Sequence, residues 1–362
     1  MGPIRWKPVR RAVICGLCLI AVSGCANESS EPVGQGAVPA EAADPSPSQQ
    51  GGVPKMSKRY VVAADGTGEY RTVQSAVDAV PAANREPVTI YIKNGVYEEK
   101  LTVPAGKRFI RFEGESKERT VLTYGDYASK KGADGKELGT TGSSSTFIYA
   151  DDFTAENITF RNTAGPAAGQ AVALYVRGDR AAFRSVRIIG HQDTLYTPGE
   201  GRQYYKDCYI EGTVDYIFGS ATAFFDQCVI HSTRSGFVTA ANTPENAEYG
   251  YVFKDCPLTG NTEAASVYLG RPWRPFARVV FTNAWMDAHI KPEGWHNWGD
   301  PEKEKTAKYA EHRSTGPGAN PDARVGWSSQ WNDEQAASLT VHEVLGGKDH
   351  WNPAQAFRDP VS

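Results

Sequence analysis

The sequence has no cluster of basic residues with interleaved aromatics, the pattern typical of proteins that bind nucleic acids. It also has no group of histidines, cysteines and acids at the spacing of a metal site, so we expect no metal. Its apolar run near the N-terminus, Ala12 to Val22, has eleven residues, too few to cross a bilayer as a helix. The sequence therefore favours neither a nucleic-acid-binding protein nor a helical membrane protein.

The N-terminal run has the features of an export signal. Small residues and Cys25 follow it, and four basic residues precede it: Arg5, Lys7, Arg10 and Arg11. The segment 22–25 resembles a bacterial lipobox, so we expect residues 1–25 to be a lipoprotein signal peptide and Cys25 to be lipidated. The alternative is an ordinary secretory signal cut elsewhere. We expect an exported protein, lipid-anchored to a bacterial membrane, and Ala26 favours the outer membrane if the organism is Gram-negative.

The segment that follows has few residues that could form a core. Residues 26–57 are rich in Pro, Gly, Ser and Ala and contain no aromatic residue, which is typical of a disordered tether. Without residues 1–25 the chain has 35 basic and 42 acidic residues, a net charge of −7. A polyanionic substrate would have to be held by local groups. Residues 58–362 form the predicted folded domain.

The folded domain contains an internal repeat. Five copies of a pattern with apolar residues at positions 0, +3 and +5 are separated by 22, 20, 28 and 28 residues. They begin at Phe183, Tyr205, Phe225, Phe253 and Phe281. Short strands at such intervals predict an all-β fold, a parallel β-helix with long loops on one side. A β-sandwich would not usually preserve one pattern at this period. A short helix is predicted over 72–80, near the N-terminal end of the domain.

The repeat predicts that two aspartates are neighbours. Asp193 lies ten residues after Phe183, and Asp215 lies ten residues after Tyr205. Stacked coils place equivalent residues about 4.8 Å apart. In the third copy the same offset gives Ser235, so the acidic ladder stops at two. Two adjacent carboxylates have pKa values that are driven apart, which suits an acid and a nucleophile or base. The alternatives to a catalytic role are that the two aspartates lie in turns, cap backbone amides or form a ladder that binds Ca²⁺.

Three cysteines outside the signal peptide occupy position +3 of consecutive copies. They are Cys208, Cys228 and Cys256. The coil spacing falls within the range that a disulfide accepts, and we expect a Cys208–Cys228 bond. A Cys228–Cys256 bond and a ladder of buried thiols are the alternatives.

Five motifs around these residues resemble, in order, those of the pectin methylesterase (pectinesterase) family. They are Gly95-Val96-Tyr97-Glu98-Glu99, Gln170-Ala171-Val172-Ala173-Leu174, Gln192-Asp193-Thr194-Leu195, Val214-Asp215-Tyr216-Ile217-Phe218-Gly219 and Leu269-Gly270-Arg271-Pro272-Trp273. The resemblance covers about Tyr60 to Trp351. It implies a right-handed parallel β-helix that hydrolyses the methyl esters of galacturonate units in pectin, without a cofactor, in a bacterial lipoprotein form of the family.

The resemblance also implies roles for five residues. Asp215 is the expected nucleophile, although Tyr216 replaces a commoner phenylalanine after it. Asp193 is the expected proton donor and acceptor. Arg271 is expected to orient and ionise Asp215, since a guanidinium lowers the pKa of a neighbouring carboxyl. Two amides are expected to stabilise the oxyanion. They are Gln170 and Gln192.

Substrate-binding residues are predicted from the resemblance and from aromatic character. Flat aromatic faces suit the apolar faces of sugar rings, although core packing could explain each ring. The expected substrate-binding residues are Thr146, Gln170, Arg271, Trp273, Tyr196, Phe218 and Phe276. Trp295 and Trp298 could flank the cleft or pack late loops, and His191 is interpreted as structural.

The leading hypothesis is a membrane-tethered carbohydrate esterase that acts on methylesterified pectin. Its expected partners are this polymer and, through the lipid anchor, a membrane. We expect a monomer. An acyl-thioesterase is the second hypothesis, and changed glutamines or aromatics would favour it. A non-catalytic polysaccharide-binding β-helix is the third, and replacement of Asp193, Asp215 or Arg271 would favour it.

Overall fold

The computed structural model describes residues 58–357. The predicted signal peptide (1–25), the lipidation site Cys25 and the predicted tether (26–57) lie outside the described residues. Within residues 58–357, no helix is long and apolar enough to cross a membrane.

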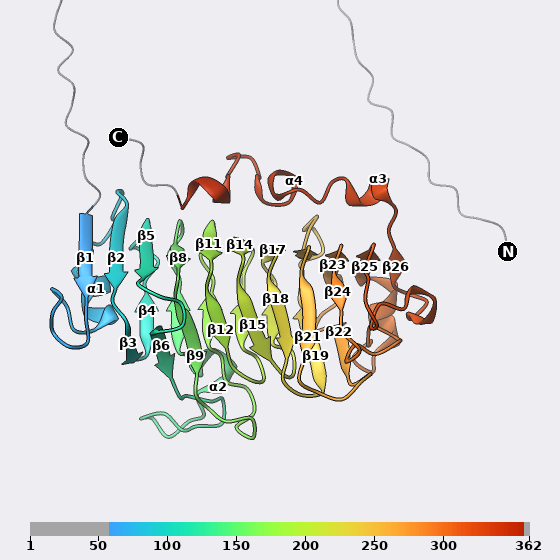
Figure 1. Ribbon diagram of the computed structural model, residues 1–362, viewed down its shortest axis with the longest axis horizontal. Coiled ribbons are helices and arrows are strands. Elements are labelled where there is room, and N and C mark those ends of the chain that lie inside the picture. Colours follow the sequence, from blue (N-terminus) through green and yellow to red (C-terminus); the bar gives the residue numbers. More distant parts are fainter. Residues whose placement is uncertain (1–57, 358–362) are drawn as a thin grey trace, which may run out of the picture. The chain divides into compact units, whose positions relative to one another are not determined.

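The described chain winds through three parallel sheets, coil after coil (Figure 1). Sheet A has the order β1 (Lys58–Val62), β2 (Val88–Ile92), β5 (Ile110–Gly114), β8 (Thr154–Glu156), β11 (Ala181–Arg184), β14 (Arg202–Lys206), β17 (Thr222–Asp226), β20 (Tyr251–Lys254), β23 (Arg278–Thr282), β25 (Lys308–His312) and β26 (Ser329–Gln330). Sheet B has the order β3 (Gly95–Glu98), β6 (Thr120–Tyr124), β9 (Thr159–Asn162), β12 (Arg187–Ile189), β15 (Tyr209–Gly212), β18 (Val229–Ser232), β21 (Pro257–Gly260) and β24 (Trp285–Met286). Sheet C has the order β4 (Leu101–Val103), β7 (Thr146–Ile148), β10 (Leu174–Val176), β13 (Leu195–Thr197), β16 (Ile217–Gly219), β19 (Gly236–Ala241) and β22 (Val267–Pro272).

Each strand pairs in parallel with the equivalent strand one coil away, so the prediction of a right-handed parallel β-helix is confirmed. The helices are short: α1 (Val73–Ala79), α2 (Gly139–Gly142), η1 (Pro301–Lys305), η2 (Pro321–Ala323), α3 (Asp333–Ala336), α4 (Val341–Leu345) and η3 (Pro353–Gln355). The predicted N-terminal helix is α1. Thr72 caps it by accepting a hydrogen bond from the Ser75 amide, and its apolar residues are buried.

The five predicted repeat positions form one ladder inside the coils. Strand pairing aligns Phe183, Tyr205, Phe225, Phe253 and Phe281. Their rings stack with centroid separations of 4.9, 4.7, 4.4 and 4.5 Å. Two residues after each ring, the chain takes a positive φ of 52° to 54° and turns from sheet A into sheet B. The repeat is therefore one coil of the helix.

The predicted Cys208–Cys228 disulfide is wrong. All three cysteines of the described chain are free and buried. The Cys208 thiol donates to the Phe183 carbonyl at 3.6 Å, and the Cys228 thiol donates to the Tyr205 carbonyl at 3.3 Å. Because each sulfur points at the backbone of the preceding coil, equal spacing of the coils does not produce a bond. The alternative, a ladder of buried thiols, describes the structure.

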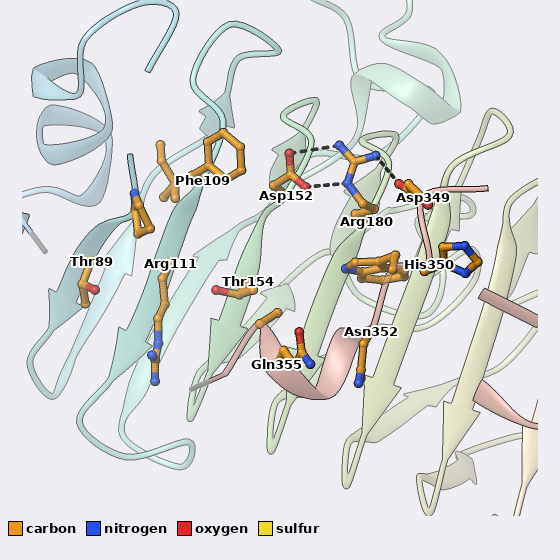
Figure 2. A pocket seen from close by; sticks show the side chains of 14 residues that line it. Thr89, Phe109, Arg111, Asp152, Thr154, Arg180, Asp349, His350, Asn352 and Gln355 are labelled. Atoms are coloured by element: carbon orange, nitrogen blue, oxygen red, sulfur yellow. Dashed lines mark hydrogen bonds and ion pairs between the residues drawn. The ribbon is translucent and has the colours of Figure 1, made fainter. Parts of the chain in front are cut away.

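The C-terminal segment, which contains α3, α4 and η3, lies along the outer face of sheet A (Figure 1). A pocket of about 530 Å³ remains between this segment and the sheet. Figure 2 shows Arg180 between Asp152 and Asp349, with both of which it forms ion pairs. Arg202 also binds Asp349. These ion pairs hold the C-terminal segment against sheet A. The two predicted site residues, Asp193 and Asp215, lie instead at sheet C.

Candidate active site

Strand pairing places Asp193 and Asp215 on adjacent coils at the same position of sheet C. Leu195 pairs with Ile217. Asp193 lies two residues before Leu195, and Asp215 lies two residues before Ile217. The Asp193 amide donates to the Val214 carbonyl at 3.0 Å, which continues the same register. The structure therefore brings the two predicted carboxylates together.

Both aspartates have a left-handed backbone. Their φ angles are 64° for Asp193 and 51° for Asp215. Aspartate tolerates this region better than most residues, yet such conformations cost on the order of 1–3 kcal/mol and cluster at functional sites. The two turns thus occur where each coil enters sheet C, and they fix the side chains at the edge of the sheet.

The third coil differs from the sequence expectation. Ile217 pairs with Thr239, so the position aligned with Asp215 is Phe237 and not Ser235. Two additional residues in this coil shift the register. The acidic ladder still stops at two, and an aromatic ring replaces the third member.

Arg271 binds Asp215 with both arms of its guanidinium. Nε donates to Oδ1 at 2.9 Å and Nη2 donates to Oδ2 at 2.7 Å. Arg271 lies on β22, two coils beyond β16. On the intervening strand, β19, Ala240 pairs with Phe218 of β16 on one side and with Arg271 on the other. We infer that the small side chain of Ala240 leaves the room through which Arg271 reaches back.

Two aromatic rings enclose the Arg271 guanidinium. Its Cζ lies 3.8 Å from the ring centroid of Phe237 and 3.7 Å from that of Trp298. Trp298 has a φ of 64°, and its amide donates to His296 Nδ1 at 2.9 Å. Sequence reasoning missed Phe237, because only the pairing register shows that it follows the two aspartates on the next coil.

Burial and charge raise the pKa of both carboxyls. The pKa of Asp193 lies well above its ordinary value, first because of burial and second because of Asp215, with a smaller opposing effect from Arg271. The pKa of Asp215 is also raised, because burial outweighs the lowering effect of Arg271. The expected lowering of the Asp215 pKa by Arg271 is therefore present, but burial, which the sequence argument did not consider, outweighs it. Asp193 remains the stronger proton holder of the pair.

The predicted amide donors lie on adjacent coils beside the aspartates. Gln170 and Gln192 form a parallel bridge. Gln170 is exposed and Gln192 is partly exposed. Neither side-chain amide has a hydrogen-bonding partner within residues 58–357, so both are free to bind a ligand.

Most of the predicted aromatic residues gather at sheet C. The rings of Tyr196 and Phe218 stack at 4.2 Å, and Trp273 lies 6.4 and 6.0 Å from them. Phe218 is buried, whereas the other two are partly exposed. Tyr175 extends this group toward the N-terminal coils, 5.3 Å from Tyr196. The group forms an aromatic surface beside the carboxylates.

Two predicted binding residues are not part of this surface. Thr146 is 1% exposed and pairs with Leu174, in line with the core residue Leu195. A substrate contact through its side chain is not supported. Phe276 is partly exposed, with a φ of 68°, and its amide donates to Thr306 Oγ1 at 3.3 Å. It makes no ring contact with the aromatic surface.

The structure gives different environments to the two tryptophans whose role the sequence left undecided. Trp295 is 1% exposed and packs against Tyr309 in the core, with a ring separation of 4.4 Å. Trp298 contacts Arg271. His191 is partly buried, and its carbonyl accepts hydrogen bonds from Thr213 and Thr194, which agrees with a structural role.

Comparisons with known proteins point to one family. The sequence model of the family described as pectinesterase matches residues 59–348. The chain is 46% identical over 289 residues to pectinesterase 31 of Arabidopsis thaliana, with 78% of this chain and 91% of the relative covered. It is similar to the solved structure of pectin methylesterase from carrot, with a TM-score of 0.74, 35% identity and coverage of 83% and 97%. A pectin methylesterase solved in complex with a hexasaccharide has a TM-score of 0.73, 34% identity and coverage of 82% and 99%.

Proposed function

The chain belongs to the pectinesterase family, and we propose that it hydrolyses the methyl esters of galacturonate units in pectin, releasing methanol. The observation that carries this proposal is the bidentate contact between Arg271 and Asp215. Asp193 lies beside this pair, on the adjacent coil. The hexasaccharide complex of a similar protein supports an oligosaccharide substrate.

In the first proposed step, the Asp215 carboxylate attacks the ester carbonyl. Arg271 orients Asp215 and favours its ionised form. The amides of Gln170 and Gln192 donate hydrogen bonds to the oxyanion that develops. Asp193 gives its proton to the departing methoxy oxygen, so methanol leaves and an acyl-enzyme anhydride remains.

In the second proposed step, the ionised Asp193 takes a proton from water. The hydroxide formed attacks the galacturonyl carbonyl, and the bond to Asp215 breaks. The product carboxylic acid and the Asp215 carboxylate are released, with Asp193 protonated again. The raised pKa of Asp193 suits both roles, because the group holds a proton near neutral pH more readily than an exposed aspartate.

The other two hypotheses fit the site less well. A thioesterase has no evident need for the partly exposed aromatic surface around Tyr196 and Trp273. A purely binding protein does not explain why two carboxylates and a guanidinium are assembled at the cost of burial.

Methanol release from highly methylated pectin tests the proposal. We expect release by the full chain and little hydrolysis of an acyl-thioester under the same conditions. Thioester hydrolysis without methanol release would favour the thioesterase, and neither reaction would favour the binding protein.

We also propose that the protein is a monomer anchored to a membrane by a lipid on Cys25. The lipobox-like segment 22–25 and the tether-like composition of residues 26–57 support this localisation. Fractionation of cells tests it: Cys25→Ser should move the protein from the membrane to the soluble fraction. Membrane association that survives the substitution would contradict lipidation at this residue.

A further inference from the structure

The loop that follows Trp295 holds Trp298 in a conformation that a bulky residue rarely adopts. The φ of Trp298 is 64°, in the left-handed region, which is costly for a large side chain. Such a conformation persists only where neighbouring groups fix it. Because the Arg271 Cζ lies 3.7 Å from the centroid of this indole, the conformation of the loop determines what covers a catalytic guanidinium.

The imidazole of His296 fixes this turn. The Trp298 amide donates to His296 Nδ1 at 2.9 Å. Asparagine and aspartate side chains make the same contact in turns, with the amide two residues further along the chain. The next residue of the loop repeats the pattern, since the Gly299 amide, at a φ of 70°, donates to Asn297 Oδ1 at 2.8 Å. Two consecutive side-chain acceptors therefore shape the loop.

The contact with the Trp298 amide requires a neutral imidazole. A backbone amide can only donate, so Nδ1 of His296 presents its lone pair and the proton of the neutral ring lies on Nε2. Protonation of Nδ1 would place two N–H groups against each other. Burial lowers the pKa of His296 first, and the positive charge of Arg271 lowers this pKa further. The ring is therefore neutral at pH 7 and gains its charge only in acid.

His296 is itself held against the candidate active site. Its amide donates to the Gly270 carbonyl at 3.1 Å, which ties it to the residue before Arg271. Its ring packs edge-on against Phe237 and Tyr268, with centroid separations of 5.6 and 5.3 Å. Phe237 is the second ring on the Arg271 guanidinium. One imidazole therefore contacts one ring of this aromatic enclosure and holds the backbone of the other.

The charged and titratable groups around the imidazole do not change charge in the range where His296 does. They are Arg271 and Tyr268 of β22 and, from the same loop, Lys291, whose Nζ lies 5.1 Å from the Tyr268 ring centroid. Burial first and Glu293 second raise the pKa of Tyr268, so its phenol stays neutral in acid. Arginine and lysine side chains keep their charge between pH 4 and 7.

We propose that His296 is a positioning residue, whose neutral ring holds Trp298 on the guanidinium that orients Asp215 and whose protonation releases Trp298. This inference rests on the proposed function and adds to it a support that is sensitive to acid. When the ring is protonated, Trp298 leaves its left-handed turn and Arg271 loses one of its two aromatic faces. His296 touches no reacting atom, and it acts through Trp298 and Arg271.

Two substitutions separate the acceptor from its charge. His296→Leu removes the acceptor, so we expect kcat for methanol release at pH 7 to fall by about tenfold, because the nucleophile is less well oriented. His296→Asn keeps an acceptor that suits this turn and does not titrate, so it should restore most of the lost activity.

The pH profile distinguishes this role from a merely structural one. The wild type and His296→Asn share the acidic limb that Asp215 causes, so the ratio of their kcat/KM values reports the titration of His296. This ratio should fall between pH 7 and 4, by up to about tenfold per pH unit once the imidazole is protonated. His342→Asn is the matched control, since it makes the same substitution at an exposed histidine of α4, and it should follow the wild type at every pH.

Far-ultraviolet circular dichroism verifies the folding of each variant, and the ratio of wild type to His296→Asn decides the matter even if His296→Leu does not fold. A folded His296→Leu protein with the kcat of the wild type, or a ratio that stays constant with pH, would overturn the role of His296 alone. Absence of methanol release by the wild type at every pH would instead overturn the proposed function, and this inference with it.

Discussion

Asp193 and Asp215 differ in their surroundings although they occupy equivalent positions. Arg271 stabilises the ionised form of Asp215, whereas Asp193 has burial and a neighbouring carboxylate that both favour its protonated form. Activity requires Asp215 ionised and Asp193 protonated in the free enzyme. The profile of kcat/KM against pH should therefore be bell-shaped, with the pair titrating as one coupled system.

Arg271→Lys should move the acidic limb of this profile to higher pH. Lysine cannot make the two-pronged contact, so the ionised form of Asp215 is less stabilised and its pKa rises further. We expect a loss of about tenfold or more in kcat/KM, since orientation is also lost. Initial rates of methanol release between pH 4 and 9 measure this, and an unmoved acidic limb would show that Arg271 does not control the ionisation of Asp215.

Asp193→Asn should stabilise the fold while it removes activity. Because the folded-state pKa is raised, ionisation of Asp193 destabilises the fold as pH rises above the unfolded-state value near 4. The variant should gain about 1 kcal/mol or more in free energy of unfolding at pH 7, since one pKa unit is worth about 1.4 kcal/mol.

Urea unfolding at pH 7 and pH 4 measures this gain, which should shrink at pH 4, where the wild-type carboxyl is protonated in the fold. Asp207→Asn, at an exposed corner with a φ of 52°, is the control, since it makes the same substitution at a side chain that is not buried. An Asp193→Asn protein less stable than the wild type at pH 7 would contradict the burial argument.

At the residue scale, the sequence was sufficient to identify the charged residues of the site. It was not sufficient to predict how buried they are or which rings surround them. Asp193, Asp215 and Arg271 follow from the repeat and the motifs. The net direction of the Asp215 pKa does not, because it depends on how completely the site is buried. Phe237 was missed because two additional residues in its coil change the offset on which the sequence argument relied.

At the scale of single strands, β19 lies between β16, which follows Asp215, and β22, which carries Arg271. The size of the side chains on β19 therefore determines whether Arg271 can reach Asp215. Ala240 is 2% exposed and separates Phe218 from Arg271. Ala240→Leu should fill the space that Arg271 crosses and lower kcat/KM by about 100-fold, the scale expected when a catalytic contact is displaced.

Ala240→Ser is the conservative control, since it adds one atom and should keep most of the activity. Methanol release by the two variants, with far-ultraviolet circular dichroism to verify folding, measures the effect. Normal activity of a folded Ala240→Leu protein would show that Arg271 reaches Asp215 by another route.

The elements themselves were largely predictable. The ladder from Phe183 to Phe281 gave the coil length, and the Thr72 cap gave the start of α1. That Cys208 and Cys228 stay unbonded was not predictable from coil spacing, because the direction of each Sγ depends on the corner that precedes it. The left-handed residue at that corner, Asp207, turns the chain so that the thiol meets the carbonyl of the preceding coil.

At the scale of the described molecule, a buried ion pair joins the last coils. Arg324 donates from Nε to Glu311 at 2.6 Å, and both side chains are 2% exposed. The same guanidinium donates to the carbonyls of Lys291, Pro292 and Gly318. One side chain thus ties three segments at the C-terminal end of the coils.

Arg324→Met should lower the free energy of unfolding by about 3–5 kcal/mol, because it leaves the Glu311 carboxylate buried without its partner. Arg313→Met is the comparison: Arg313 and its partner Asp333 are 64% and 69% exposed, and the loss should be under about 1 kcal/mol. Urea unfolding of both variants measures the difference, and equal losses would contradict the role given to the buried pair.

The central claim is that Asp215 attacks the methyl ester, and one measurement tests it most directly. Methanol release from highly methylated pectin should be readily detected with the wild type and should be abolished in Asp215→Asn, whose amide keeps the shape of the side chain without its nucleophilic charge. Near-normal release by a folded Asp215→Asn protein would contradict the account.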